Sequence, residues 1–249
     1  MTGPNLAAQG EILKLARVLG TEPERLAYLA RVDPAELRAL RESITDTLFD
    51  ANLYVLQRMA LASRLVPAPV LAKIAEKVFG PLLCARIAGL VDASRGVDVA
   101  KRLSPRFLAE VAAELDPRRA SAIISGIPLG TVVEVAAELV RREDWITLGR
   151  FVGHLPDPTV REALRVIDDA ALLRVAFVLD DKSRIDHVVG LLPEKRFIGL
   201  LRVTVTDPEL APPALDMLTH LSPARRQVLL PFLDTLPESL RAQAQAMIK

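Results

Sequence analysis

A short apolar pattern recurs about every twelve residues from residue 71 to the C-terminus of this 249-residue chain. When the last apolar residue of a repeat is taken as position zero, the residues three, four and seven places earlier are almost always apolar too. Leu115, for example, follows Ala112, Val111 and Leu108 at these spacings. Such spacing places all four side chains on one face of a helix. The pattern therefore predicts an array of short helices.

Each repeat is followed directly by residues that punctuate a helical chain. Ser104-Pro105, Asp116-Pro117 and Ser222-Pro223 are examples, and Pro128 and Pro193 stand at equivalent places. Repetition at a fixed period is typical of stacked helical arrays, in which each unit buries its apolar stripe only against its neighbours. No segment shows the strict alternation of a half-buried strand. We therefore expect an all-α chain, and specifically an α-solenoid of short helices of about twelve residues.

Two regions differ in regularity, and we expect them to be separate parts of the chain. Residues 1–66 form a less regular N-terminal helical segment, and residues 67–249 form the short-helix solenoid repeat domain. Within the second region, three prolines and two threonines make residues 202–216 the least helical stretch. We expect a break there, followed by a closing helix pair over about 207–249.

The N-terminal segment predicts three helices. One covers Leu6–Leu19, a short one opens at Thr21, and a long one starts at Asp33-Pro34 and runs to about residue 66. Asp33 can accept a hydrogen bond from a first-turn amide, and Pro34 loses no useful donor at the first helical position. Past Leu48 the apolar residues of the long helix lie on more than one side. This helix is therefore expected to make contacts on several faces or to form a dimer contact.

The stretch from Val97 to about Leu201, most clearly LSPRFLAEVAAELDPRRASAIISGIP, resembles the cytoplasmic N-terminal domain of MgtE-type magnesium transporters. That domain is a right-handed superhelix of short helices, related to the armadillo-like helices of the flagellar motor-switch protein FliG. The resemblance implies a right-handed superhelical solenoid with an MgtE-N-like core over about 97–201. It also implies a response to magnesium. This chain has no transmembrane part, and the acidic metal-binding residues of the family cannot be matched to positions here, so no site is carried over.

Composition excludes several classes of protein. Apolar residues make up 51% of the chain but aromatic residues only 4%, which suits closely packed short helices of Leu, Val, Ile and Ala. The formal net charge of +1 creates no global field toward nucleic acid or anionic lipid. The single cysteine, Cys84, stands at a core position of its repeat and cannot form an intramolecular disulfide. Neither a signal peptide nor a run long enough to span a membrane is evident, so we expect a cytoplasmic protein.

No catalytic motif can be recognised. The three histidines form neither an i, i+4 pair nor an HExxH motif, and GxSxG and phosphate-binding glycine loops are missing. His154 and His220 each stand just before position zero, where an imidazolium would meet the carbonyl end of a helix favourably. The sequence thus predicts no catalytic residue, no cofactor-binding residue and no metal ligand, and we expect the protein not to be an enzyme.

Two acidic pairs, Asp168-Asp169 and Asp180-Asp181, could be drawn as a divalent metal site with Asp186 and His187. Both pairs are expected to open consecutive antiparallel helices. Twelve residues of helix would then separate the pairs by on the order of 15–18 Å, so they could not share an ion. N-capping is the preferred interpretation of both pairs.

The candidate partner-binding residues are Arg118, Arg119, Arg141, Arg142 and Trp145. The two arginine pairs lie two repeats apart, which predicts that they share one edge of the array. A row of guanidinium groups could bind an acidic protein, a phosphate or nucleic acid, whereas a solvated, salt-bridged edge is the structural alternative. Trp145 opens the one repeat in the middle of the array that is stretched to sixteen residues, where it serves as a core wedge or as a partner-facing anchor.

The leading functional hypothesis is a non-enzymatic α-helical repeat scaffold for protein–protein interaction or self-association, with an unknown protein or a second copy as partner. The alternative is a divalent-ion-responsive regulatory module that senses magnesium, as the MgtE resemblance implies. A solenoid that binds nucleic acid or phosphate through the arginine edge ranks below both.

Overall fold

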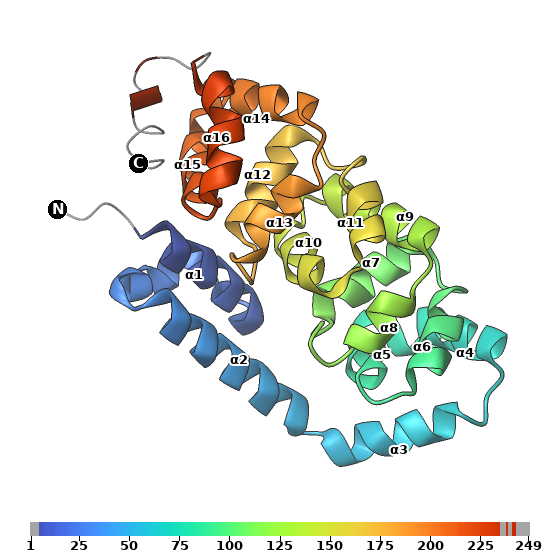
Figure 1. Ribbon diagram of the computed structural model, residues 1–249. Helices are drawn as coiled ribbons and strands as arrows, with labels where there is room; N and C mark the ends of the chain where they lie inside the picture. The colour runs from blue at the N-terminus through green and yellow to red at the C-terminus, as the bar shows by residue number, and fades with distance from the viewer. Residues whose placement is uncertain (1–4, 235–237, 239–240, 243–249) are drawn as a thin grey trace. The chain divides into compact units, whose positions relative to one another are not determined.

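The chain folds into helices joined by short turns (Figure 1). This structure, a computed structural model, describes residues 5–234, 238 and 241–242, and contains no strand among them. The predicted all-α class is confirmed, whereas a right-handed superhelix remains a prediction. The α-helices are α1 Leu6–Leu19, α2 Pro34–Asp50, α3 Leu53–Ser63, α4 Ala68–Ile74, α5 Gly80–Ala88, α6 Ala93–Ala100, α7 Pro105–Glu114, α8 Ser121–Gly126, α9 Leu129–Arg141, α10 Trp145–Phe151, α11 Asp157–Ala163, α12 Asp169–Phe177, α13 Arg184–Gly190, α14 Lys195–Thr206, α15 Ala211–Thr219 and α16 Pro223–Leu233. Short 3₁₀ segments are η1 Pro23–Arg31, η3 Val152–His154 and η4 Pro208–Leu210, and η2 Ala75–Phe79 is a π-helical turn.

Polar side chains start several helices by capping their first turn. Asp33 Oδ1 accepts a hydrogen bond from the Ala35 amide at 2.8 Å, and Asp168 Oδ1 accepts one from the Ala171 amide at 2.7 Å. Ser104 caps the start of α7 in the same way. Each bond satisfies a backbone donor that has no partner inside the helix. The capping roles predicted for Asp33 and Asp168 are confirmed.

The single long helix predicted from residue 34 to about 66 is wrong. Helix α2 ends at Asp50, and α3 begins at Leu53. Asn52 between them has φ −128° and ψ 23°, which is not helical. Side chains of Asp and Asn compete for backbone hydrogen bonds and favour turns, so Asp50 and Asn52 provide a local reason for the break. As a result α3 is a separate helix of eleven residues.

The break predicted over residues 202–216 is smaller than expected. Helix α14 continues to Thr206, and only Asp207 separates it from η4 and α15. The buried Thr204 fits the helix because its hydroxyl donates to the Leu200 carbonyl at 2.8 Å. The prolines of α15 stand in its first turn, where a missing amide costs little. Of the closing pair predicted over about 207–249, α15 and α16 are described, and most of the chain beyond residue 234 lies outside the described residues.

The contacts group the chain into two compact units. Unit 1 combines residues 1–43 with residues 167–249, and unit 2 covers residues 44–166. Helix α2 therefore begins in unit 1 and ends in unit 2. These units are defined by contacts, whereas the division at residue 66 was predicted from the regularity of the repeat. That division therefore remains a prediction.

Within unit 2, helices two apart in chain order pack against each other. Helix α5 packs against α7, α6 against α8, α7 against α9, and α9 against α11. Each short helix thus has apolar neighbours before and after it. This is the packing that a repeated amphipathic helix of this length permits.

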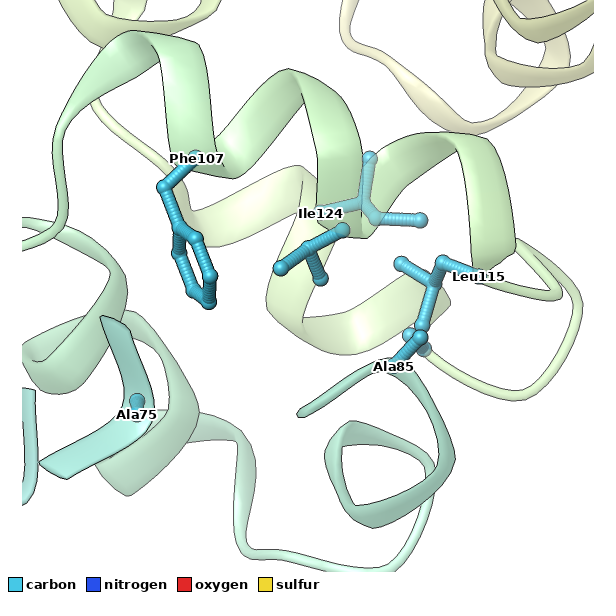
Figure 2. Packing of buried hydrophobic residues seen from close by; sticks show 7 residues of the cluster. Ala75, Ala85, Phe107, Leu115 and Ile124 are labelled. Carbon is cyan, nitrogen blue, oxygen red and sulfur yellow. The ribbon is translucent and has the colours of Figure 1, made fainter. Parts of the chain in front are cut away.

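The apolar core of unit 2 lies where α5, α7 and α8 meet. Figure 2 shows Phe107, Leu115 and Ile124 turned toward one another, with Ala75 and Ala85 nearby. Small alanines beside large side chains allow close packing. The buried members of this core cluster are Ala75, Ala85, Phe107, Val111, Leu115, Ala120 and Ile124.

Cys84 packs against this core cluster, partly buried, as its place in the repeat predicts. Burial raises the pKa of the Cys84 thiol to about 11. The thiol is therefore protonated near neutral pH and is a poor nucleophile.

Helices α6 and α8 approach closely because glycine occurs on both. A Cβ atom on Gly96 would overlap the Cδ1 atom of Ile123, and one on Gly126 would lie 2.8 Å from Val97 Cγ2. Glycine leaves room there for branched side chains from the opposite helix. This contact depends on the absence of a side chain rather than on backbone freedom.

In unit 1, α12 is buried on several sides. It packs against α14 and α15, and Ala171, Leu172, Leu173 and Val175 are all buried. The segment is apolar nearly all round, which is the pattern expected of a helix in contact on several sides.

Helix α1 is held in unit 1 by close backbone contact with the end of α12 and by ion pairs. It ends at Gly20, whose φ of 63° is left-handed, and the Gly20 amide bonds back to the carbonyls of Ala16 and Arg17. Near its middle, Gly10 has so little space that an added Cβ would lie 3.0 Å from the Phe177 carbonyl oxygen. Helix α1 therefore lies close to the end of α12.

An ionic cluster of Glu11, Lys14, Arg38, Arg41 and Asp180 joins α1, α2 and the turn after α12. The Glu11 carboxylate accepts bonds from Lys14 Nζ, from Arg38 Nη2 at 3.3 Å and from Arg41 Nε at 3.2 Å. Asp180 Oδ1 accepts bonds from Lys14 Nζ at 2.9 Å and Arg41 Nη2 at 3.0 Å. Glu11, Lys14 and Arg41 are only 2%, 3% and 6% exposed. Buried charges of this kind are tolerated only when they are paired.

The predicted capping role is wrong for Asp180, because its carboxylate is turned to the ionic cluster instead. Its neighbour Asp181 does cap the following turn: its Oδ1 accepts a bond from the Ser183 amide at 3.0 Å. Asp180 differs from Asp181 because its partners are tertiary: Arg41 and Lys14 lie 139 and 166 positions away in the sequence.

A second ion pair, partly buried, lies in the same unit. Lys182 Nζ donates to Asp216 Oδ2 at 2.7 Å and to the carbonyls of Ala176 and Phe177 at 2.9 Å each. Burial lowers the pKa of Lys182, and the hydrogen bond to Asp216 opposes that effect. Lys182 thereby satisfies the carbonyl end of α12.

Candidate interaction surface

The first predicted arginine pair is engaged by carboxylates of its own unit. Arg118 Nη2 lies 3.1 Å from Asp46 Oδ1 and 2.8 Å from Asp116 Oδ2, and Arg119 Nη2 lies 2.8 Å from Asp46 Oδ1. The Arg119 guanidinium also covers the Phe49 ring, 3.9 Å from its centroid. Burial alone would raise the pKa of Asp116, but its hydrogen bonds and charge interaction with Arg118 outweigh burial and lower it. This pair ties α2 to the turn after α7.

The second arginine pair is engaged as well. Glu138 Oε1 accepts bonds from Arg141 Nη2 and Arg142 Nε, both at 2.7 Å. Arg142 Nη2 also donates to Glu110 Oε1 at 3.1 Å and to the Arg106 carbonyl at 3.3 Å. The charges of both arginines are thus balanced by carboxylates within the same helix pair. These contacts fit the alternative in which the arginines form intramolecular salt bridges rather than a binding surface.

The two arginine pairs do not share an edge, contrary to the expectation from their spacing. Arg142 follows α9 and contacts Arg106 and Glu110 in the first two turns of α7, whereas Arg118 and Arg119 follow the other end of α7. A helix of ten residues is about 15 Å long, so the pairs lie near opposite ends of α7. Repeat counting predicts that α7 and α9 run in the same direction, whereas the contact of Arg142 with Arg106 places the end of α9 at the start of α7.

The pKa of Glu138 offers a direct measurement of this second pair. The hydrogen bonds from Arg141 and Arg142 lower the pKa of Glu138 to about 2. Because the folded-state value lies below the ordinary value of 4.5, the stabilisation is present above pH 4.5 and is lost as pH falls toward 2. We expect the Glu138 Cδ chemical shift to titrate near pH 2 and to move up by more than one pH unit in Arg141→Gln/Arg142→Gln. A wild-type midpoint near 4.5 would contradict the pairing.

Trp145 opens α10 and is partly buried. Helix α9 before it is thirteen residues long and ends with Glu143 in a left-handed conformation, φ 55°. Bonds from the Asp144 amide to the Leu139 carbonyl and from the Glu143 amide to the Val140 carbonyl close this end. The long α9 and its closing turn account for the stretched repeat. Neither of the predicted roles of Trp145, core wedge or partner anchor, is decided by these contacts.

The acidic residues considered for a metal site are separated and engaged in other contacts. Asp169 pairs with Arg196, Asp180 belongs to the ionic cluster, and Asp186 accepts a bond from the Ser222 amide at 2.8 Å. Among the residues that the structure describes, no group of three His, Cys, Asp or Glu side chains is arranged to hold a metal ion.

Among the described residues, one face of α3 and the turn after it carry several large apolar side chains that are exposed. Tyr54, Val55, Leu61 and Leu65 are 69%, 55%, 58% and 87% exposed. We call Tyr54, Val55, Arg58, Leu61 and Ala62, together with Leu65 in the turn that follows the helix, the outer face of α3. Successive residues turn by 100° around a helix, so the five helical residues occupy an arc of about 120°. That is the width of a stripe that normally faces a core.

The opposite side of α3 already packs within unit 2. Leu56, Ala60 and Ser63 are buried there, and α3 packs against α5. Arg95 donates to the carbonyls of Ser63 and Val66, which holds the end of α3 in place. Helix α3 is thus anchored by one face and leaves a second apolar face exposed.

The segment that carries the outer face has only cationic charged residues, and at the end of α3 Arg64 pairs with Asp92 at 3.0 Å. No Asp or Glu occurs between Ala51 and Ala75. Arg58 is the charged member of the outer face, and its guanidinium lies 5.7 Å from the centroid of the Tyr54 ring. Its Nη1 atom lies 3.4 Å from the Tyr54 hydroxyl oxygen.

The sequence contains a signal for the outer face of α3, although the predicted partner-binding residues are the arginine pairs and Trp145. Apolar residues on more than one side of the segment after Leu48 indicated contacts on several faces or a dimer contact. The outer face could have been identified from two features of the sequence. Tyr54, Arg58, Leu61 and Leu65 have helical spacing, and the segment around them lacks acidic residues. Which apolar side is buried, however, depends on α5 and Arg95.

Comparisons with known protein families, with curated proteins and with solved structures find no match for this chain. In the part of the chain that the structure describes, no helix combines the length and the apolar character needed to cross a membrane.

Proposed function

We propose that this chain is a non-enzymatic α-helical repeat scaffold that associates with a second copy of itself through the outer face of α3. The observation that carries the proposal is a helix with two apolar faces, of which one is buried and the other exposed. Exposed apolar patches of more than a few hundred Å² mark interaction surfaces in soluble proteins.

The area of the outer face fits a dimer of modest stability. Its four large apolar side chains expose on the order of 500 Å². With Arg58, Ala62 and the helix backbone around them, the face approaches the ~800 Å² per partner of a standard interface. We therefore expect a dissociation constant in the micromolar range, about 1–100 μM.

The outer face is also complementary to itself, as a two-fold interface requires. It offers a large and a small apolar side chain next to each other, Leu61 and Ala62, so that each can lie against the other across a two-fold axis. Both side chains are present on every copy. An unrelated acidic helix is the competing occupant.

The other two functions considered from the sequence have weaker support. An ion-responsive module is implied by the MgtE resemblance alone, and the acidic residues considered for it pair with cations or backbone amides. Recognition of nucleic acid or phosphate by the arginine pairs would require breaking their bonds to Asp46, Asp116 and Glu138.

Light scattering across a dilution series tests the proposal. We expect the mass of the wild-type protein to rise from the 27.2 kDa of one chain toward twice that value between about 1 and 300 μM. Leu61→Glu places a charge in the middle of the outer face, and we expect it to weaken dimerisation at least 30-fold without lowering the melting temperature.

The matched control is Leu129→Glu, which alters an exposed leucine of the same unit at the start of α9. It should dimerise like the wild type. A wild-type monomer at every concentration would overturn the proposal, and so would a dimer that Leu61→Glu leaves unchanged.

A further inference from the structure

We infer that the two copies pair their α3 helices antiparallel, with the two-fold axis passing between Leu61 and Ala62. This inference rests on the proposed self-association and adds the register of the contact. It follows from where the charge and the small residue lie on the outer face.

A two-fold axis must cross the outer face, and the interface is largest when the axis crosses its centre. On the arc of about 120°, two points along α3 lie near the centre line. One is Arg58. The other lies between Leu61 and Ala62.

An axis at Arg58 would set the two Arg58 guanidinium groups against each other, with no acidic residue between Ala51 and Ala75 to separate them. Like charges facing each other across an interface oppose binding. An axis between Leu61 and Ala62 removes this conflict, because Arg58 then lies opposite the partner's Leu65.

In the second register each contact has a physical reason. The aliphatic stem of Arg58 covers the partner's Leu65, which is otherwise 87% exposed. Leu61 packs on the partner's Ala62, whose small side chain allows the helices to approach to about 8–10 Å.

Cysteine cross-linking tests this register in the full chain. In a disulfide the two Cα atoms lie about 4.4–6.8 Å apart, a distance that only residues beside the axis reach. We expect Ala62→Cys to form a disulfide-linked dimer under mild oxidation at least ten times faster than Gln57→Cys. Gln57 is exposed on α3 but lies outside the outer face, so it is the matched control.

A mixing experiment adds a second readout. We expect Arg58→Cys mixed with Leu65→Cys to yield the mixed disulfide in preference to either self-linked dimer. The wild-type protein gives the background, which should be low because Cys84 is partly buried and the pKa of its thiol is raised to about 11.

The outcomes separate the two proposals. Rapid self-linking of Arg58→Cys, with slow linking of Ala62→Cys, would overturn the register while the dimer seen by light scattering stands. Equal rates at Ala62 and Gln57 in a protein that dimerises would also overturn it. A wild-type protein that stays monomeric in light scattering would overturn the proposed function itself.

Discussion

Glu11→Ala is expected to lower the free energy of unfolding by about 3–5 kcal/mol, among the largest effects of any single substitution in this chain. Glu11 is 2% exposed and accepts bonds from Lys14, Arg38 and Arg41. Removing the carboxylate leaves Lys14 and Arg41 buried with Asp180 as the remaining acidic partner in the ionic cluster. The cost comes mainly from uncompensated buried charge rather than from a lost contact.

Urea denaturation followed by circular dichroism measures this effect. Glu11→Gln keeps the shape and one acceptor oxygen, so its cost should lie between those of the wild type and Glu11→Ala. Glu134→Ala removes an exposed glutamate from α9 and should change stability by less than about 0.5 kcal/mol. If Glu11→Ala proved as mild as Glu134→Ala, the ionic cluster would not hold α1 in place.

Phe107→Ala is expected to cost about 3–5 kcal/mol, because it empties the centre of the unit 2 core cluster. Phe107 is buried in one cluster with Leu115, Ile124, Ala75 and Ala85 (Figure 2). Neighbouring alanines have no long side chain that could move into the space. The cavity should therefore remain largely open.

Thermal and urea unfolding of Phe107→Ala and Phe107→Leu provide the measurement. Phe107→Leu keeps most of the apolar volume, and we expect it to cost about 1–2 kcal/mol. Equal stability of the two variants would mean that the cluster closes around the lost ring, and the packing argument would fail. Neither substitution alters the outer face of α3, so dimerisation should persist as long as the protein remains folded.

Local elements were predicted most accurately where a residue acts on its own neighbours. The range Leu6–Leu19 predicted for the first helix is the range observed, because Gly20 can adopt the left-handed conformation that ends it. Asp33 and Asp168 cap helices as predicted, since a cap needs only amides two or three residues away.

Predictions that depend on distant partners were less accurate. Asp180 has the same local pattern as Asp168, yet its carboxylate binds Lys14 and Arg41 across the fold. The long helix after Asp33 was extended through Asp50 and Asn52 because the apolar pattern continues on both sides of them. A pattern of apolar residues does not distinguish one bent segment from two helices.

The candidate interaction surface shows the same difference between local features and features that depend on distant partners. The arginine pairs stood out in the sequence because their charges are adjacent, whereas their carboxylate partners Asp46 and Glu110 lie 32 or more positions away. The outer face of α3 was visible only as excess apolar residues. It became a specific surface once the buried side of α3 was known.

The sequence by itself determined that this protein is helical, where most helices begin, and that each helix has an apolar stripe. These properties follow from interactions between residues at most a few positions apart. Only the tertiary structure decided which charges are buried together, that the two arginine pairs lie near opposite ends of α7, and which apolar face of α3 is left exposed. Burial is a property of the packed chain, because a side chain is removed from water only by residues that the fold brings to it.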